Sequence, residues 1–164
     1  MKQLWAPWRM SYINGDEAAT PRDCIFCLRE SAAEDRARQV LFRGDHAVVM
    51  MNRYPYTNGH LMIAPFRHTA DLALLTAEEV VEMHRFSVLA QKVLREAMQP
   101  QGFNLGMNLG RAAGAGVEDH LHLHLVPRWV GDTNFMPVFD EVRVIPQHLD
   151  ETYTLLLRHF QVYR

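Results

Sequence analysis

The seven residues His120-Leu121-His122-Leu123-His124-Leu125-Val126 form the clearest pattern in this chain. Polar and apolar residues alternate strictly, and neighbouring side chains of a β-strand point to opposite faces. We therefore predict a strand over His120–Val126 that ends at Pro127. Its leucines should face the core, and its three imidazoles should share the other face at a spacing of about 7 Å.

Three histidines on one face allow more than one interpretation. Imidazole titrates near neutral pH and is a common acid, base, nucleophile or metal ligand. The alternative to a catalytic or metal-binding role is a solvent-exposed strand face on which the histidines have no function. One metal ion bound by all three is excluded, because they would span about 13–14 Å whereas a zinc–nitrogen bond is about 2 Å.

The surrounding sequence predicts further strands. Apolar runs bounded by turn residues indicate strands over Gln39–Arg43, Ala47–Asn52, His60–Pro65, Phe103–Leu109 and Val138–Ile145. Gly44-Asp45 joins the first two as a turn, and loops are expected over Tyr54–Gly59 and Arg111–Gly116.

One long helix is predicted over Thr76–Met98. Thr76 and Glu79 form a capping box, and Pro100 and Gly102 end the helical pattern. Apolar residues recur at helical spacing, namely Val80, Met83, Phe86, Ala90, Val93, Leu94 and Ala97. Shorter helices are expected near Leu28–Ala37 and over Pro146–Tyr163. Hairpin strands beside one long helix predict an α+β domain with an antiparallel sheet.

Length and charge restrict the class of protein. The 164 residues predict one domain over 1–164, with an irregular N-terminal extension over 1–37 and a C-terminal helical segment over 147–164. A net charge of -2 argues against a protein that coats nucleic acid. No apolar run approaches the length of a membrane span, and the N-terminus lacks a signal-peptide core. We therefore predict a cytoplasmic protein with neither nucleic-acid nor membrane partners.

The only two cysteines, Cys24 and Cys27, form a Cys-x-x-Cys pair. In a reducing compartment this spacing is typical of half a metal site or of a redox pair. A thioredoxin-like role is disfavoured, because the chain lacks the matching strand and helix around the pair. A reduced pair without metal is the remaining alternative.

The histidine stretch resembles the His-φ-His-φ-His-φ-φ motif of the histidine triad (HIT) superfamily of nucleotidyl hydrolases and transferases. Asn58–Pro65 is similar to that family's Gly-His-hydrophobic-Pro strand, and Asn52 precedes it. The segments Leu4–Ile13, Val126–Trp129 and Gly131–Phe135 resemble the branch that acts on diadenosine tetraphosphate. The resemblance covers roughly residues 4–146.

This resemblance implies a mechanism. His122 would attack the α-phosphate of a dinucleoside polyphosphate and form a nucleotidyl-histidine, with His124 and His60 completing the catalytic cluster. Nucleotide and phosphate binding would fall to Asn52, Asn108, Gly114, Ala115, Gly116 and Val117, together with His122 and His124. Many family members carry Gly-Gln-Ser/Thr in the last loop, and this chain departs from that pattern because it has no glutamine there.

The resemblance also implies a structural zinc ion and a homodimer built on a five-stranded, mainly antiparallel sheet. The zinc ligands would be Cys24, Cys27, His68 and His120. An adenine nucleotide is the expected substrate partner. The other four histidines are expected at the surface, namely His46, His84, His148 and His159.

Several activities remain open at this stage. The acceptor of the nucleotidyl group could be water or phosphate, so the protein could be a hydrolase or a phosphorylase (an ATP adenylyltransferase). A nucleoside phosphoramidate hydrolase is a further alternative within the family. A non-catalytic nucleotide sensor is the alternative outside enzymes, although a sensor needs no nucleophile.

Overall fold

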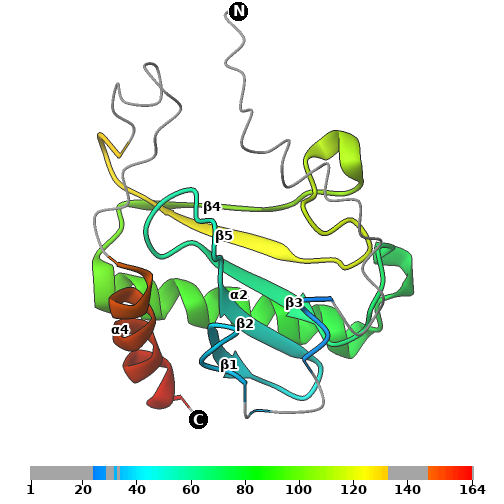
Figure 1. The fold of residues 1–164 in the computed structure, drawn as a ribbon, viewed down its shortest axis with the longest axis horizontal. Helices are drawn as coiled ribbons and strands as arrows, with labels where there is room; N and C mark the ends of the chain where they lie inside the picture. Colours follow the sequence, from blue (N-terminus) through cyan, green and yellow to red (C-terminus); the bar gives the residue numbers. More distant parts are fainter. Residues whose placement is uncertain (1–23, 29–31, 33, 133–147, 164) are drawn as a thin grey trace, which may run out of the picture.

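A computed structural model describes residues 24–28, 32, 34–132 and 148–163. Five strands form one antiparallel sheet in the order β1-β2-β3-β5-β4. Their bounds are β1 Val40–Arg43, β2 Ala47–Met51, β3 Leu61–Pro65, β4 Gly102–Met107 and β5 Leu123–Arg128. The helices are α2 Ala77–Met98 and α4 Leu149–Gln161, with 3₁₀ turns η1 Leu72–Leu74 and η2 Arg111–Ala113 (Figure 1). The predicted α+β class with a five-stranded antiparallel sheet is therefore confirmed.

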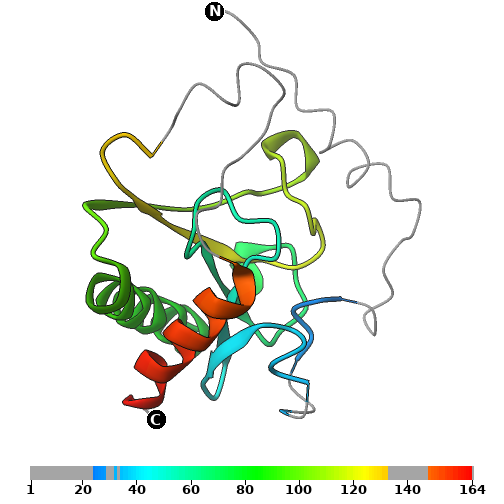
Figure 2. The ribbon, with the colours of Figure 1, turned by 60° about the vertical axis from the view of Figure 1, so that its left-hand side comes forward.

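The central strands of the sheet are buried on both faces. In β2, Val49 and Met51 face one core cluster, which also contains the apolar side chains of α2 and α4. Val48 and Met50 face a second cluster, which contains the segment Cys24–Leu28. Figure 2 shows the two helices on one side of the sheet and this segment, in blue, on the other. The sheet therefore has a helix face and an opposite face, and the opposite face carries the histidines described below.

Helix α2 forms as its sequence predicts at both ends. The Thr76 side chain accepts a hydrogen bond from Glu79 N, and the Glu79 carboxylate accepts one from Thr76 N, which is the predicted capping box. The helix ends at Gln99, whose φ of 51° is left-handed, directly before Pro100. No helix in the described part of the chain is long and apolar enough to cross a membrane.

The apolar stripe of α2 differs from the prediction at one position. Val80 is 51% exposed, whereas Glu79 is buried. The buried stripe runs through residues 79, 83, 86, 90, 93 and 94, so residue 80 lies beside it. Glu79 is accommodated there because its carboxylate binds the Arg67 guanidinium at 2.9 Å as well as the helix N-terminus.

The predicted strand over His120–Val126 is wrong at both ends. Strand β5 begins at Leu123, because Leu121 N donates to Thr69 O at 2.8 Å and leaves the sheet ladder. It continues through Pro127 to Arg128. Pairing with β3 stops at Leu125, so Pro127 needs no N–H on that side. The other predicted strands of the described part are found, with ends displaced by one or two residues.

Of the two shorter helices that the sequence predicts, one is found in the described residues. The short helix near Leu28–Ala37 is wrong where the chain is described, since residues 34–39 form turns. There Arg43 binds both the Asp35 carboxylate, at 2.9 Å from its Nε, and the Leu28 carbonyl, which folds the segment back on β1. The C-terminal helix is confirmed as α4. Its predicted start at Pro146 and the predicted strand Val138–Ile145 lie outside the described residues.

The β1–β2 turn is fixed to α2 by one carboxylate. Glu82 accepts hydrogen bonds from three successive amides, at 3.1 Å from Asp45 N, 2.7 Å from His46 N and 2.6 Å from Ala47 N. A Cβ on Gly44 would lie 2.5 Å from Phe86 Cζ, so the turn requires glycine at that position. The helix and the hairpin therefore hold each other in register.

We expect Glu82→Ala to lower the free energy of unfolding by about 2–3 kcal/mol, because three backbone N–H groups lose a charged acceptor. Urea denaturation followed by circular dichroism would measure the change. Glu118→Ala is the control, since that carboxylate makes only an exposed contact of 3.8 Å with Arg111 and should change stability by less than about 1 kcal/mol. Equal losses in the two variants would contradict a special role for Glu82.

Candidate functional site

The three motif histidines lie where the chain enters β5, on the face opposite the helices. His124 pairs with Met62 of β3 and with Gly106 of β4. Met62 belongs to the second core cluster, which places His124 on the same face as that cluster. The predicted burial of the alternating leucines is confirmed for Leu121, which is 4% exposed, and for Leu125, which is fully buried, whereas Leu123 is half-buried against the helix-side core.

His122 has one ring nitrogen fixed by the backbone. Its Nδ1 lies 2.9 Å from the His120 carbonyl oxygen. Because a carbonyl can only accept, Nδ1 carries the proton, and Nε2 of the neutral ring keeps a lone pair. Burial lowers the pKa of His122, which favours the neutral imidazole. His122 is therefore a nucleophile candidate with its reactive atom already defined.

His60 and His124 form a second defined pair. Tyr56 N donates to His60 Nδ1 at 3.1 Å, so the proton of the neutral ring resides on Nε2. His60 Nε2 lies 2.9 Å from His124 Nδ1 and donates to it. The proton of a neutral His124 is then on its Nε2. This series of hydrogen bonds makes His124 Nε2 a donor, which suits contact with a phosphate oxygen.

The rings around His124 complete the cluster. The His122 and His124 ring centroids lie 4.8 Å apart at 74°, closer than the spacing expected along a strand. The Tyr56 ring lies 4.7 Å from His60 and 5.9 Å from His124. The sequence did not single out Tyr56, because a loop residue takes part in no periodic pattern. Only the fold brings it beside the histidines.

Asn52, predicted to bind nucleotide, is placed beside this cluster. Its Oδ1 accepts from Tyr54 N at 2.8 Å, and its Nδ2 lies 3.4 Å from His60 Nδ1. The asparagine therefore helps to hold the loop that supplies the Tyr56 amide. The structure brings together His60, His122, His124 and Asn52 as the sequence interpretation requires.

The predicted phosphate loop is a compact turn. Gly110 and Gly114 have φ of 76° and 82°, which only glycine adopts readily. Asn108 Nδ2 donates to Gly114 O at 3.3 Å and braces the loop. Gly114 N and Ala115 N donate to carbonyl groups within the loop, at 2.9 and 3.4 Å. Of the four loop residues predicted to bind phosphate, Gly114 and Ala115 thus use their amides for the turn itself.

The sheet surface next to His124 carries a glycine, which leaves it open among the described residues. Gly106 pairs with His124 across β4 and β5. A Cβ built on Gly106 meets no atom of the described residues within 4 Å. Asn104 and Asn108 lie two residues to either side of Gly106 in sequence, so Asn104 points to the same face within β4. This face therefore has room for a ligand beside the histidine cluster.

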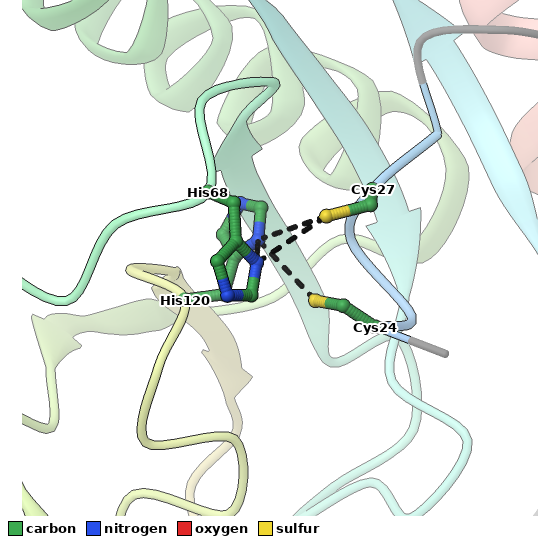
Figure 3. A group of neighbouring side chains, drawn as sticks. All are labelled: Cys24, Cys27, His68 and His120. Atoms are coloured by element: carbon green, nitrogen blue, oxygen red, sulfur yellow. Dashed lines mark hydrogen bonds between the residues drawn. The ribbon is translucent and has the colours of Figure 1, made fainter. Parts of the chain in front are cut away.

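A second group of side chains includes His120, two residues before His122. Cys24, Cys27, His68 and His120 place their ligand atoms within 4.8 Å of one another (Figure 3). Cys24 Sγ and Cys27 Sγ lie 3.3 and 3.8 Å from His120 Nδ1, and His68 Nδ1 lies 3.2 Å from His120 Nδ1. The four residues predicted as metal ligands are therefore found together, from three separate segments.

Four of the six separations between these atoms are 3.2–3.8 Å, and all six are within 4.8 Å. With zinc bonds of about 2.3 Å to sulfur and 2.0–2.1 Å to nitrogen, ligand atoms at tetrahedral angles are separated by about 3.3–3.8 Å. His120 Nε2 donates to Pro65 O at 2.8 Å, which leaves its Nδ1 unprotonated and aimed at the two sulfurs. The donor set and its orientation thus suit zinc.

The same environment alters the pKa values of two members of this group. Burial lowers the pKa of His120 to about 4, so its ring is neutral at pH 7, as a metal ligand must be. Burial, with a contribution from Cys24, raises the pKa of Cys27 to about 11. Cys27 is therefore a thiol at pH 7 unless a cation displaces its proton.

The remaining histidines lie away from both clusters. His46, His84 and His148 are exposed, as predicted. His159 is half-buried on α4, with its Nδ1 3.9 Å from a Glu96 carboxylate oxygen. None of the four contributes to the grouping of histidines at β5.

Comparison with known proteins places this geometry in a family. The model of the HIT domain matches residues 34–130. Over 163 residues, the chain is 37% identical to the AP-4-A phosphorylase of Mycobacterium tuberculosis, which covers 95% of this chain and 83% of that protein. It is 27% identical over 93 residues to the bis(5'-adenosyl)-triphosphatase of Dictyostelium discoideum, covering 57% and 62% of the two chains.

Solved structures agree with the sequence comparison on the fold. A zinc-bound histidine triad family protein from Mycobacterium smegmatis superimposes with a TM-score of 0.66 at 24% identity, over 88% of this chain and 97% of that one. The family model spans all five strands and the triad, and the M. tuberculosis relative matches 95% of this chain, so this chain belongs to the HIT domain family.

Proposed function

We propose that this HIT protein is a nucleotidyltransferase that cleaves dinucleoside polyphosphates, with diadenosine tetraphosphate as substrate, through an intermediate on His122. The observation that carries the proposal is the hydrogen bond from His122 Nδ1 to the His120 carbonyl, which leaves Nε2 as the nucleophile. The name of the M. tuberculosis relative, an AP-4-A phosphorylase, supports the choice of substrate.

In the first step, His122 Nε2 attacks the α-phosphorus. The Nε2–P bond forms, and the bond between phosphorus and the bridging oxygen breaks. ATP leaves with the bonding electron pair on that oxygen. His124 Nε2–H, oriented through His60 and Tyr56 N, donates to the phosphate oxygens and stabilises the charge on them.

In the second step, an acceptor releases the adenylyl group from His122. We propose inorganic phosphate as this acceptor, by analogy with the relative named as a phosphorylase. A phosphate oxygen bonds the phosphorus, the P–N bond breaks, and ADP leaves while His122 returns to its neutral form. With water as the acceptor, the product would be AMP.

Contacts to the nucleotide are assigned to the residues that frame the open face beside His124. Asn52 and Asn108 lie at its borders and hold the loops there. The loop Gly114–Val117 precedes the triad and is proposed to contact phosphate. Because this loop has no glutamine amide that could donate a hydrogen bond to phosphate, we assign that hydrogen bond to His124 Nε2–H, the donor that the hydrogen bonds define.

We expect His122→Asn to abolish turnover of diadenosine tetraphosphate, with a loss of at least about 10³-fold, because the nucleophile is removed. Chromatography of the products, with and without phosphate, provides the measurement. The wild-type protein should yield ADP and ATP only when phosphate is present. His84→Asn, an exposed histidine on α2, is the matched control and should retain full activity.

Each other product pattern identifies a different function. AMP and ATP irrespective of phosphate would make the protein a hydrolase. Turnover of nucleoside phosphoramidates alone would make it a phosphoramidate hydrolase, and binding without turnover would make it a sensor. A His122→Asn variant as active as the wild-type protein would contradict the assigned nucleophile.

We also propose that Cys24, Cys27, His68 and His120 hold a structural zinc ion. The separations of 3.2–3.8 Å in four of the six pairs of ligand atoms support this assignment, as does the zinc-bound structural relative. When bound, the ion supplies no chemistry to the substrate; it fixes the backbone at His120, whose carbonyl orients His122. The compartment we propose is the cytoplasm, where thiols stay reduced.

We expect the purified protein to contain about one zinc per chain, and Cys24→Ala to lose most of it, because three ligands bind zinc far more weakly than four. Elemental mass spectrometry measures the number of zinc ions per chain. His46→Ala, an exposed histidine, should retain zinc. A folded wild-type protein that stays metal-free in zinc-supplemented medium would disprove the zinc site.

A homodimer is the proposed assembly. Among the described strands, β4 pairs only with β5, so its outer edge offers backbone groups for pairing. Leu105 on this strand is 49% exposed. Two copies of β4 meeting across a two-fold axis would cover both edges and extend the sheet.

We expect light scattering to give the wild-type protein twice the chain mass of 19.0 kDa, and Leu105→Lys to give a monomer. A charge at this position would be buried at the dimer edge without a partner. Val162→Lys is the control, because Val162 is 78% exposed on the C-terminal side of α4. A dimeric Leu105→Lys variant would exclude β4 as the interface.

A further inference from the structure

Phe26 lies between the two cysteines and is fully buried. The turn that carries it is closed by a hydrogen bond of 3.1 Å from Cys27 N to Cys24 O. Residues i and i+2 of such a turn point in different directions, so the cysteines can face His68 and His120 while Phe26 faces the sheet. Phe26 belongs to the second core cluster, on the face of the sheet that bears His124.

The Phe26 ring packs on the rings of two motif histidines. It stacks on His122 with a centroid distance of 4.7 Å and an interplanar angle of 25°. It also contacts His120 at 5.3 Å and 50°. The His122 ring is thus held at its edge by the His120 carbonyl and on its face by Phe26. Nε2 lies in the ring plane, so a ring stacked on the face does not block its attack.

The charge of His122 changes during the proposed reaction. The neutral ring keeps its proton on Nδ1, so a bond from Nε2 to phosphorus makes the ring a cation. The face of an aromatic ring attracts a cation through its quadrupole when the cation lies within about 6 Å of the centroid. The stacked Phe26 ring meets that condition for His122.

We infer that Phe26 is a positioning residue for His122, which fixes the ring plane of the nucleophile and stabilises the imidazolium formed when Nε2 bonds phosphorus. The stabilising role rests on the proposed function, whereas the positioning role does not depend on substrate. The inference also gives the Cys24–Cys27 segment a second role, because the same turn that presents the cysteines presents this ring.

Replacement of Phe26 by mono-, di- and trifluorinated phenylalanine tests the stabilising role. Fluorine weakens the quadrupole step by step and changes the shape of the ring little. We expect the single-turnover rate of adenylyl-His122 formation to fall progressively, by about tenfold for the trifluorinated ring. The dissociation constant of the substrate should not change. Equal rates across the series would overturn this role.

Nitrogen-15 NMR of the His122 ring tests the positioning role in the absence of substrate. The wild-type protein should show a single tautomer, protonated at Nδ1. Phe26→Leu should show a mixture of tautomers, because the ring can then rotate away from the His120 carbonyl. Leu28→Ala, in the same buried cluster, is the control for general loosening and should keep the single tautomer. A single tautomer in Phe26→Leu would overturn the positioning role.

Zinc content and unfolding curves, measured for every variant, separate these effects from loss of the metal or of the fold. The two hypotheses fail in different ways. A wild-type protein that never forms adenylyl-His122 disproves the proposed function and, with it, the stabilising role. An active wild-type protein whose rate is the same for every fluorinated ring disproves the stabilising role alone.

Discussion

The hydrogen bond between His122 Nδ1 and the His120 carbonyl is the constraint on which the site depends. It fixes the tautomer, and therefore decides which nitrogen of the neutral ring keeps its lone pair. A carbonyl in regular sheet pairing would be committed to its neighbouring strand. Here the residues before Leu123 lie outside the sheet pairing, and Leu121 N donates to Thr69 O instead. The late start of β5, at Leu123 rather than at His120, thus leaves the His120 carbonyl available to accept from the His122 ring.

His120 links three parts of the structure. Its Nδ1 faces Cys24 and Cys27, its Nε2 donates to Pro65 O, and its carbonyl orients His122. A shift of the His120 ring would therefore move the carbonyl that orients His122. The cluster of Cys24, Cys27, His68 and His120 thus includes the residue that orients the His122 ring.

The two faces of the sheet carry different groups of residues. The helix face is covered by α2 and α4, and Glu82 holds the first hairpin to α2 through three backbone amides. The opposite face carries the histidines of the β5 cluster, the Cys24–Leu28 segment and the open surface at Gly106. Because neighbouring residues of a strand point to opposite faces, each central strand contributes to both groups at once.

Local sequence was sufficient wherever the deciding contacts are local. The capping box of Thr76 and Glu79, the alternation that buries Leu121 and Leu125, and the Cys-x-x-Cys spacing were all predictable, because each depends on residues a few positions apart. The inclusion of His60 and of His68 in the two clusters followed only from the resemblance to the HIT family. The start of β5, the exposure of Val80 and the position of Phe26 could not be predicted, because distant partners decide them.

By itself, the sequence determined which side chains are available for the chemistry and that three histidines share one side of the chain. Only the tertiary structure decided which nitrogen of His124 carries the proton, because the deciding partner is His60 Nε2, 64 positions earlier in the chain. It also decided that Phe26, 96 positions before His122, lies against the His122 ring. The proton position of His124 and the orientation of the His122 ring depend on contacts with residues 64 and 96 positions earlier in the chain, and those contacts exist only after the sheet has formed.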